Sequence, residues 1–367
     1  MNRWRTLQST LHAAPVALRA AVALLAMFGI ACHWLITGLA PALDAPAPTG
    51  EQTVLDRLRT RFNQGFGTAS RLEPLWFDLY WRVFEPAATS SVAIGSDGWL
   101  FLRTEGEDDD VHGRRPWTDA EWRGWQDLLE GWCRVATRRD LPLVVVVAPN
   151  KSSLLSRHLP QRLDLQPQAT RYAQLQARRA ELSPPVQAAL LDLHEVLRRA
   201  GPERCYFATD SHWNFVGAEL AAAAIGERLA GLGLPPAGLA SLALLSVDVG
   251  GGDLARMLGI AAQRRETIDV PPRHADIARI EDLQRRPPPD VDPVAPPVLV
   301  IHDSFGMLLR DAFAARYPGA VFRHPPEGGF ARLDEATLDR LLAAAPYRAL
   351  VVEMVERRLS DPPGTRR

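Results

Sequence analysis

The stretch PVLVIHDSFGMLLRDAFAARY, residues 297–317, changes its hydrophobic period in the middle. Residues 298–301 form a short apolar run that is rich in β-branched side chains, which is typical of a strand buried on both faces of a parallel sheet. After Ser304 the apolar residues recur at helical spacing. We therefore predict that Ser304 lies where a buried strand turns into a helix.

A serine at the start of a helix is suited to act as a nucleophile, because unpaired N–H groups and a partial positive charge gather there. Serine is also a preferred helix cap, and Asp303 would then be a turn residue. The stretch YFATDSHWN, residues 206–214, favours the catalytic interpretation. Asp210 and His212 are two positions apart, so that an extended or turn segment can place a carboxylate beside an imidazole, the partners that a serine nucleophile needs.

The order of these motifs resembles the SGNH hydrolase-like domain of the alginate O-acetylation proteins of the AlgX/AlgJ type, over residues from about 90 to 360. Further blocks occur in the same order: Gly95–Leu102, Val144–Lys151, Gly252–Leu254 and Val351–Arg358. The resemblance implies a three-layer α/β fold with a largely parallel sheet and a permuted chain order, in which the serine follows the Asp–His loop. It also implies the roles of nucleophile, base and orienting acid for Ser304, His212 and Asp210.

Three more residues are candidates for binding the oxyanion or the substrate. Asn150 follows a predicted strand, at the same rim as Ser304, and the resemblance suggests it as an oxyanion ligand; its alternative is a turn or cap residue. Lys151 would meet an anionic sugar, or else a helix end or solvent. Trp213, beside His212, is the third candidate. Glu353 and Glu356 are either cleft residues or ion-pair partners, and the loop 250–254 either lines the cleft or is a plain loop.

The N-terminal region predicts a membrane anchor. Residues 20–40 carry no formal charge, and at about 1.5 Å per residue they would span a bilayer core of about 30 Å. Arginines precede this run and acidic residues follow it, which places residues 1–19 in the cytoplasm and the body of the protein outside it. A cleaved signal peptide is the alternative. Residues 41–53 read as a linker, and residues 54–367 as one periplasmic domain at the inner membrane.

Composition narrows the function further. The 367 residues contain 42 Lys and Arg against 43 Asp and Glu, so no basic excess indicates nucleic acid. Cys133 and Cys205 would either pair in an oxidising compartment or remain buried thiols. No Cys or His spacing matches a zinc site, so we predict no metal, and no cofactor is indicated.

Alternating strand and helix patterns from about residue 118 onward predict the α/β fold independently of the resemblance. The expected elements are a hairpin around Asp97-Gly98, a helix that starts with a capping box at Thr118, and strands at 143–147, 187–193, 298–301, 321–324 and 349–355. Residues 264–296 are polar and Pro-rich and read as a connection. The aromatic strip at 72–84 is either core or a sugar-stacking surface.

The resemblance implies an O-acetyltransferase that acts on an exopolysaccharide outside the cytoplasm and receives acetyl groups from a membrane-bound O-acyltransferase. Because the chain ends soon after its last predicted strand, it is closer to the anchored AlgJ type. A carbohydrate acetyl esterase and a non-catalytic polysaccharide-binding or scaffold subunit are the alternatives. The polymer, whether alginate, cellulose or another exopolysaccharide, stays open.

Overall fold

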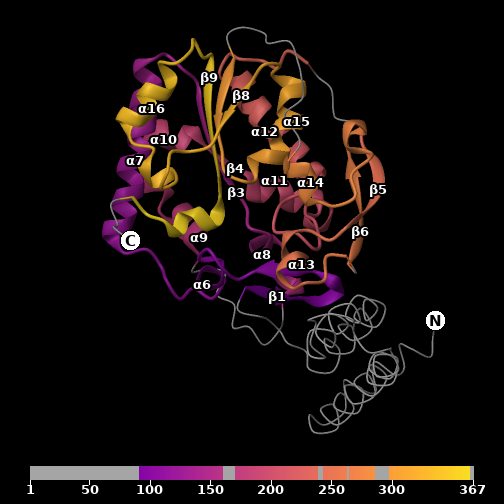
Figure 1. The fold of residues 1–367 in the computed structure, drawn as a ribbon. Coiled ribbons are helices and arrows are strands. Elements are labelled where there is room, and N and C mark those ends of the chain that lie inside the picture. The colour runs from indigo at the N-terminus through magenta and orange to yellow at the C-terminus, as the bar shows by residue number, and fades with distance from the viewer. Residues whose placement is uncertain (1–90, 160–169, 239–242, 263, 286–296, 364–367) are drawn as a thin grey trace, which may run out of the picture. The chain divides into compact units, whose positions relative to one another are not determined.

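The computed structural model describes residues 91–159, 170–238, 243–262, 264–285 and 297–363, which belong to one compact unit that spans 88–367. A five-stranded sheet lies at its centre (Figure 1). Every neighbouring pair of its strands is parallel, as predicted. In order across the sheet, the strands are β4 (Leu190–Asp192), β3 (Leu143–Ala148), β9 (Ala349–Val355), β7 (Val298–Ile301) and β8 (Val321–Arg323).

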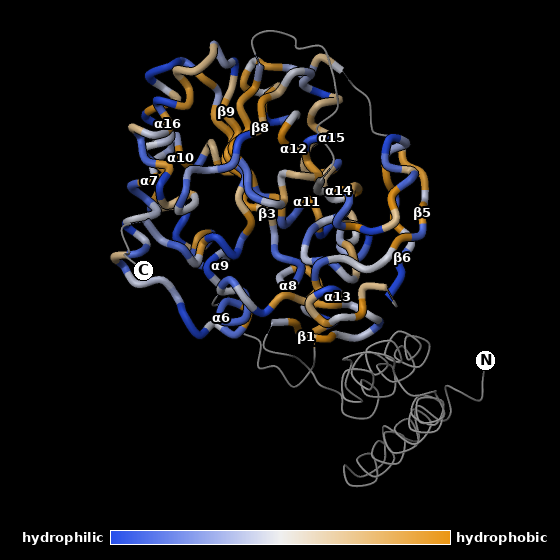
Figure 2. The backbone as a smooth tube through the Cα atoms, viewed as in Figure 1, coloured by the Kyte–Doolittle hydropathy of each residue, from blue (hydrophilic) through white to orange (hydrophobic). Residues whose placement is uncertain are grey.

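Alternate residues of the central strands enter two separate cores, which explains why these strands are apolar along their whole length. Val144 and Val146 of β3 pack with the helices on one face, whereas Val145 and Val147 pack with those on the other. The result is a three-layer α/β/α arrangement (Figures 1 and 2). The first face carries α11 (Leu193–Ala200), α12 (Phe215–Gly231) and α15 (Gly306–Arg316), and the second carries α7 (Asp119–Arg138), α10 (Pro184–Ala189) and α16 (Glu335–Leu342).

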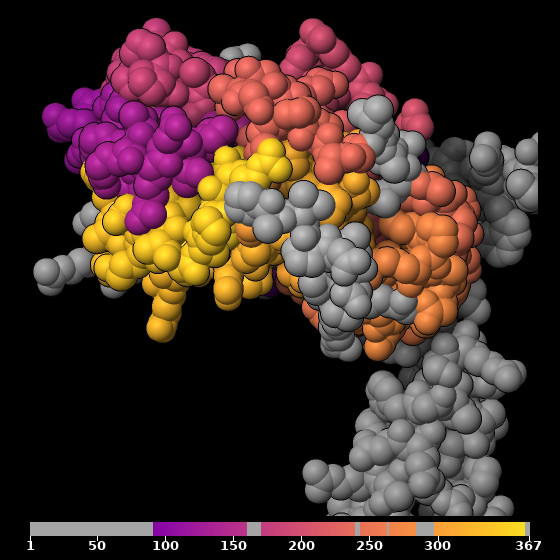
Figure 3. All heavy atoms as spheres, turned by 90° about the horizontal axis from the view of Figure 1, so that it is seen from above, coloured from indigo at the N-terminus to yellow at the C-terminus, as the bar shows by residue number. Residues whose placement is uncertain are grey.

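The capping box predicted at Thr118 is formed. The Thr118 hydroxyl accepts the N–H of Glu121 at 3.2 Å, and the Glu121 carboxylate accepts the Thr118 N–H at 2.8 Å. The helix α7 that it starts packs beside α16, so that an early and a late segment of the described domain lie side by side (Figure 3). Arg134 and Glu335 join the two helices through an ion pair of 2.6 Å.

Two antiparallel hairpins flank the sheet. The one predicted around Asp97-Gly98 consists of β1 (Val92–Ile94) and β2 (Leu100–Leu102), and both turn residues have positive φ, as such a turn requires. The other pairs β5 (Leu245–Gly250) with β6 (Arg265–Val270). The stretch 264–296, interpreted as an insertion or long connection, contributes β6 and α14 (Glu281–Arg285) in its first part; residues 286–296 lie outside the described residues.

Two further predictions have clear outcomes. The strand predicted at 187–193 is only three residues long, because Pro184 and Pro185 start a helix that occupies its first half. Cys133 and Cys205 are buried free thiols in the cores on opposite faces of the sheet, so they do not pair. Within the described ranges no helix is long and apolar enough to cross a bilayer. The anchor at 20–40, the linker at 41–53 and the aromatic strip lie outside those ranges.

Candidate active site

Strands β3, β9 and β7 end at one rim, and each is followed by a polar residue. The register aligns Ala148 with Val355 and Ile301 with Val352, so that Asn150, Glu356 and Ser304 leave neighbouring strands at the same edge. In open α/β sheets this carboxyl edge is where ligands bind. The topology thus brings together the two strand ends that the sequence singled out, with the end of β9 between them.

Asp303 fixes the turn that carries Ser304. One carboxylate oxygen accepts the Phe305 N–H at 3.0 Å, and the other accepts the Val355 N–H of the neighbouring strand at 2.7 Å. The Ser304 hydroxyl does not cap α15, because the Met307 N–H bonds to the Ser304 carbonyl, at 3.3 Å. Ser304 is half-buried, so its hydroxyl is not tied up in the helix end and can react.

Asp210 and His212 form the pair that the sequence predicted. The His212 Nδ1 lies 2.7 Å from the Asp210 Oδ1, which also accepts the His212 backbone N–H at 3.0 Å. Both side chains are buried. Burial by itself lowers the pKa of His212, but the charge and hydrogen bond of Asp210 outweigh it and raise this pKa above its ordinary value. Burial likewise opposes ionisation of Asp210, yet His212 and two backbone N–H groups hold the pKa of Asp210 well below its ordinary range.

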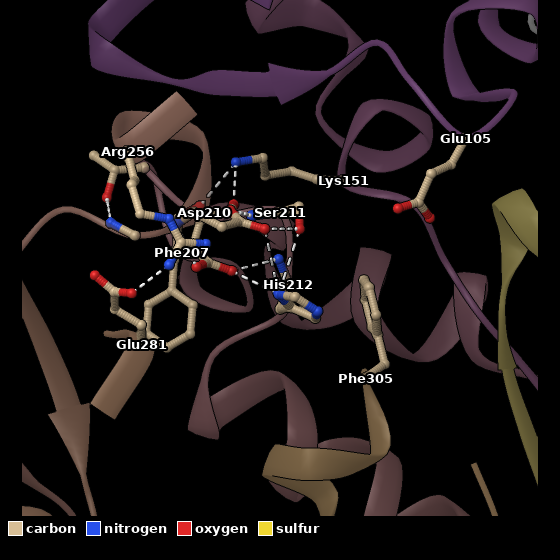
Figure 4. Close-up of polar contacts among 12 residues, drawn as sticks. Glu105, Lys151, Phe207, Asp210, Ser211, His212, Arg256, Glu281 and Phe305 are labelled. Carbon is tan, nitrogen blue, oxygen red and sulfur yellow. Dashed lines mark hydrogen bonds and ion pairs between the residues drawn. The ribbon is translucent and has the colours of Figure 1, made fainter. Parts of the chain in front are cut away.

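Lys151 is buried, so the position of its side chain gives no support to the predicted contact with an anionic sugar. Its side chain is only 2% exposed, and its Nζ donates to the backbone carbonyls of Phe207, Ala208 and Asp210 at 3.1, 3.3 and 2.6 Å. Burial lowers the pKa of Lys151 to about 8. Lys151, at the start of α8 (Lys151–Leu154), is therefore a clamp that holds the loop of Asp210 and His212 in shape (Figure 4).

Asp253 is a further part of the site, which sequence reasoning missed. Its backbone N–H donates to Asp210 Oδ2 at 2.9 Å, and its carboxylate accepts the N–H and the hydroxyl of Ser211 at 2.7 and 2.5 Å. It begins α13 (Asp253–Met257), so the loop 250–254 lines the site and is not a plain loop. Only the glycine run before Asp253 hinted at this close approach.

The side chains of Asp210, His212 and Asp253 lie close enough together to hold a metal ion. The sequence predicted no such site. Each oxygen of the two carboxylates already accepts an N–H or O–H group of the chain. This arrangement fits a carboxylate pair that orients an imidazole, and we derive no metal chemistry from it.

Trp213 is buried and does not face a substrate, which corrects the third binding candidate. Its indole Nε1 donates to the Phe305 carbonyl at 3.0 Å, and the rings of His212 and Phe305 lie 5.0 Å apart (Figure 4). These contacts dock the His212 loop against the turn that carries Ser304. In the described residues no hydrogen bond joins the Ser304 hydroxyl to His212, so the structure brings the two segments together without closing that last contact.

Asn150 fits the role of an oxyanion ligand better than that of a cap. It is fully buried, its side chain caps no helix, and neither its amide nitrogen nor its amide oxygen has a hydrogen-bond partner in the described part of the chain. A buried amide without a partner is costly and indicates a missing ligand. The Asn150 backbone N–H donates to Glu356 Oε2 at 2.9 Å.

Glu353 and Glu356 are both buried beneath the rim rather than exposed in a cleft. Burial raises the pKa of Glu356 to about 8, and the charge of Asp110 adds to this effect. Burial also raises the pKa of Glu353 well above its ordinary value, with the charge of Asp303 in support. His194 Nε2 lies 3.3 Å from Glu356 Oε2, but burial lowers the pKa of His194 to about 4, so this contact is not an ion pair near neutral pH.

A cavity of about 370 Å³ opens beside Ser304. Polar and apolar side chains share its walls, and none of the other predicted site residues lines it. Its lining consists of Asp303, Ser304, His324, Pro325, Pro326, Gly328, Gly329, Phe330, Ala331, Arg358 and Asp361. Ser304 thus lines this cavity, and Phe305, the next residue, packs against the ring of His212.

Comparison with known proteins finds a matching family model and a relative in sequence. The family model "SGNH hydrolase-like domain, acetyltransferase AlgX" matches residues 92–304, which is more than half of the chain. The "Probable alginate O-acetylase AlgJ" of Pseudomonas aeruginosa is 28% identical over 209 residues, which cover 53% of this chain and 46% of the relative. The match thus spans about half the length of that relative.

Two solved structures are also similar to parts of this chain. The O-acetyltransferase domain of Pseudomonas putida AlgJ is 19% identical, with a TM-score of 0.46 over 74% of this chain and 93% of that one. Bacillus cereus PatB1, solved with a sulfonyl adduct, is 14% identical, with a TM-score of 0.48 over 76% of this chain and 97% of that one. On the strength of the family match, the chain belongs to the family of the SGNH hydrolase-like domain of the acetyltransferase AlgX.

Proposed function

We propose that this protein transfers acetyl groups to hydroxyl groups of an exopolysaccharide, through an acetyl ester on Ser304. The observation that carries the proposal is the buried Asp210–His212 pair, which Trp213 docks against the turn of Ser304. An imidazole oriented by a carboxylate has one general use beside a serine, which is to take the proton of the hydroxyl. Family membership and the AlgJ relative support acetyl transfer to a polysaccharide.

The chemistry runs in two halves. In the first, the Ser304 oxygen attacks the acetyl carbonyl carbon, its proton passes to His212 Nε2, and the leaving group departs with that proton. In the second, a sugar hydroxyl attacks the acetyl ester, gives its proton to His212, and Ser304 recovers it as the ester bond breaks. Catalytic hydrogen bonds often tighten only in the substrate complex, so the contact between Ser304 and His212 closes when the donor binds.

The cavity beside Ser304 is the proposed place of the acceptor sugar. Polar groups on His324 and Arg358 alternate in its wall with the apolar surfaces of two prolines and Phe330. A sugar ring presents hydroxyls at its edge and C–H groups on its faces, and a wall of both kinds suits it. The identity of the polymer remains open among alginate, cellulose and other exopolysaccharides.

The cellular setting is part of the proposal. Residues 20–40 would anchor the protein in the inner membrane, with residues 54–367 in the periplasm, as the charge distribution around this run suggests. Activated acetyl groups made in the cytoplasm would then need to cross the membrane. A membrane-bound O-acyltransferase is the proposed partner that delivers them.

The decisive experiment is to treat the full-length protein in detergent with 4-nitrophenyl acetate and to map the product by mass spectrometry. We expect an acetyl adduct on the peptide that contains Ser304, and none on that peptide in Ser304→Ala. With uronate and cellulose oligosaccharides added, the acetyl group should move to the sugar. Release of free acetate alone would identify an esterase, and an unmodified Ser304 with intact sugar binding would identify a scaffold subunit.

The pH dependence of acylation provides a separate prediction. His212 acts as a base only when neutral, and the environment raises its pKa above the ordinary value of 6.5. The rate of Ser304 acylation should therefore fall as the pH decreases, with a midpoint above 6.5. The groups that set this pKa are Asp210 and Asp253, which raise it, and Arg357, which lowers it. A midpoint below 6.5, from stopped-flow rates between pH 5 and 9, would contradict this environment.

A further inference from the structure

Arg357 occupies the centre of the rim. It follows the end of β9, in the short helical turn Glu356–Ser360, and β9 lies between β3 and β7. Arg357 therefore leaves the sheet between the strand end that carries Asn150 and the one that carries Ser304. Although it is an arginine at the edge of a sheet, it is only 4% exposed. Sequence reasoning assigned it no role.

The contacts of Arg357 place its guanidinium beside the reacting groups. Its Nε donates to Glu105 Oε2 at 2.9 Å, and its central carbon lies 5.4 Å from the centre of the Phe305 ring, the residue after Ser304. The charge of Arg357 also acts on His212 and on Asp303, the residue before Ser304. The guanidinium of Arg357 thus contacts Phe305, and its charge acts on Asp303 and on His212, the proposed base.

Among the residues that the structure describes, one edge of this guanidinium has no hydrogen-bond partner. Arg357 Nη1 is buried, and its nearest carboxylate, Glu107 Oε2, is 3.9 Å away, too far for a hydrogen bond. Guanidinium groups in structural ion pairs use their planar fork to satisfy several N–H groups at once. Within the described residues, the Asn150 amide, on the neighbouring strand end, likewise has no hydrogen-bond partner, and two such unsatisfied groups at one rim fit an acceptor that arrives with the substrate.

We propose that Arg357 is a further catalytic residue, which donates a hydrogen bond from Nη1 to the oxyanion formed when Ser304 attacks the acetyl carbonyl. This inference rests on the proposed function. Attack forms the bond between the serine oxygen and the carbonyl carbon, and the π electrons of the carbonyl move to its oxygen. Arg357 and Asn150 stabilise that negative charge without giving up a proton, and the charge returns to the carbonyl when the leaving group departs. A cation in a buried site stabilises such a charge more than it would in water.

The two glutamates that contact Arg357 keep it charged and in place. Burial by itself lowers the pKa of Arg357, but the charges of Glu107 and Glu105 outweigh this and raise it. Glu107 is in turn held by the Ser152 hydroxyl at 2.5 Å, on the helix that follows Asn150. Glu107 therefore connects the segments of the two proposed donors, because it contacts Arg357 and also Ser152, which follows Asn150.

The test compares stopped-flow rates of Ser304 acylation in the full-length protein. We expect Arg357→Gln to lower the acylation rate constant about 10²-fold, as the loss of one oxyanion donor does elsewhere, with little change in the ester concentration for half-saturation. Arg357→Lys should recover only part of the rate, because an ammonium cannot reproduce the planar fork. The matched control is Arg316→Gln. This change, at the end of α15, removes an ion pair with Glu219 of α12 and should keep the wild-type rate.

Two further measurements separate catalysis from structure. Free guanidinium added at millimolar concentration to Arg357→Ala should restore the rate at least tenfold with saturation, which a merely structural role would not produce. Glu105→Gln removes the ion pair but leaves the guanidinium. Its acylation rate should be at least tenfold higher than that of Arg357→Gln. Equal losses in Glu105→Gln and Arg357→Gln, without guanidinium rescue, would overturn the inference. So would wild-type acylation in Arg357→Gln, whereas a wild-type protein that never acylates Ser304 would instead overturn the proposed function.

Discussion

Replacing Asp210 with Asn is expected to lower the rate of Ser304 acylation about 10⁴-fold, the size of effect seen when the acid of a serine triad is replaced in this way. One oxygen of Asp210 accepts two N–H groups of His212, and the other accepts the Asp253 N–H. An asparagine has one oxygen and one NH₂ group, so it cannot accept on both sides. If the NH₂ group faces the Asp253 N–H, two donors face each other. If it faces His212 instead, the imidazole is forced into the wrong tautomer.

The loss of charge adds to the loss of geometry. The negative charge of Asp210 raises the pKa of His212, and it would stabilise the imidazolium that forms during acylation. The control is Asp248→Asn, which changes an exposed aspartate of β5 that pairs with Arg265. Burst rates with 4-nitrophenyl acetate measure the effect, and melting curves show whether Asp210→Asn remains folded. An Asp210→Asn protein that acylates within tenfold of the wild-type rate would exclude Asp210 as the orienting acid.

Replacing Gly252 with Ala is expected to have the second-largest effect. A Cβ atom at this position would lie 2.4 Å from the Cβ and from Oδ2 of Asp210, a distance at which one of the groups must move. The backbone of Gly252 has φ −83°, which any residue adopts, so only the lack of space requires glycine here. Asp210 is clamped by its bonds to His212 and Asp253, and its displacement would pull the imidazole out of position.

We expect Gly252→Ala to lower the acylation rate about 10³-fold, between the cost of a misplacement by 1 Å and that of losing the acid. Gly231→Ala, at the end of α12, is the matched control, because nothing lies within 4 Å of the added Cβ. That control should keep full activity and a melting temperature at or above that of the wild type. Unchanged activity in Gly252→Ala would show that the loop 250–254 does not support Asp210.

Local sequence rules predicted the elements because each depends on residues that are close together in the chain. The apolar run 298–301 predicts β7, and Thr118 with Glu121 predicts the start of α7. Asp210 and His212 were paired correctly because two residues so close together reach one another whatever surrounds them. The strand at 187–193 was predicted too long because an apolar run and a short helix share the same pattern, and Pro184 is the better signal.

The roles of side chains at the rim depended on the tertiary structure. Lys151 and Trp213 look in the sequence like groups for a substrate, but the fold buries both, and their polar atoms bind backbone carbonyls of other segments. The glycine run before Asp253 was the only local hint of its role, and Arg357 was assigned none, because the partners of both residues lie on segments far away in the sequence. The sequence alone thus determined the strands, the helices and the pairing of the Asp–His loop. Only the packing of β3, β9 and β7 side by side decided which polar groups meet Ser304, because that depends on contacts between residues far apart in the chain.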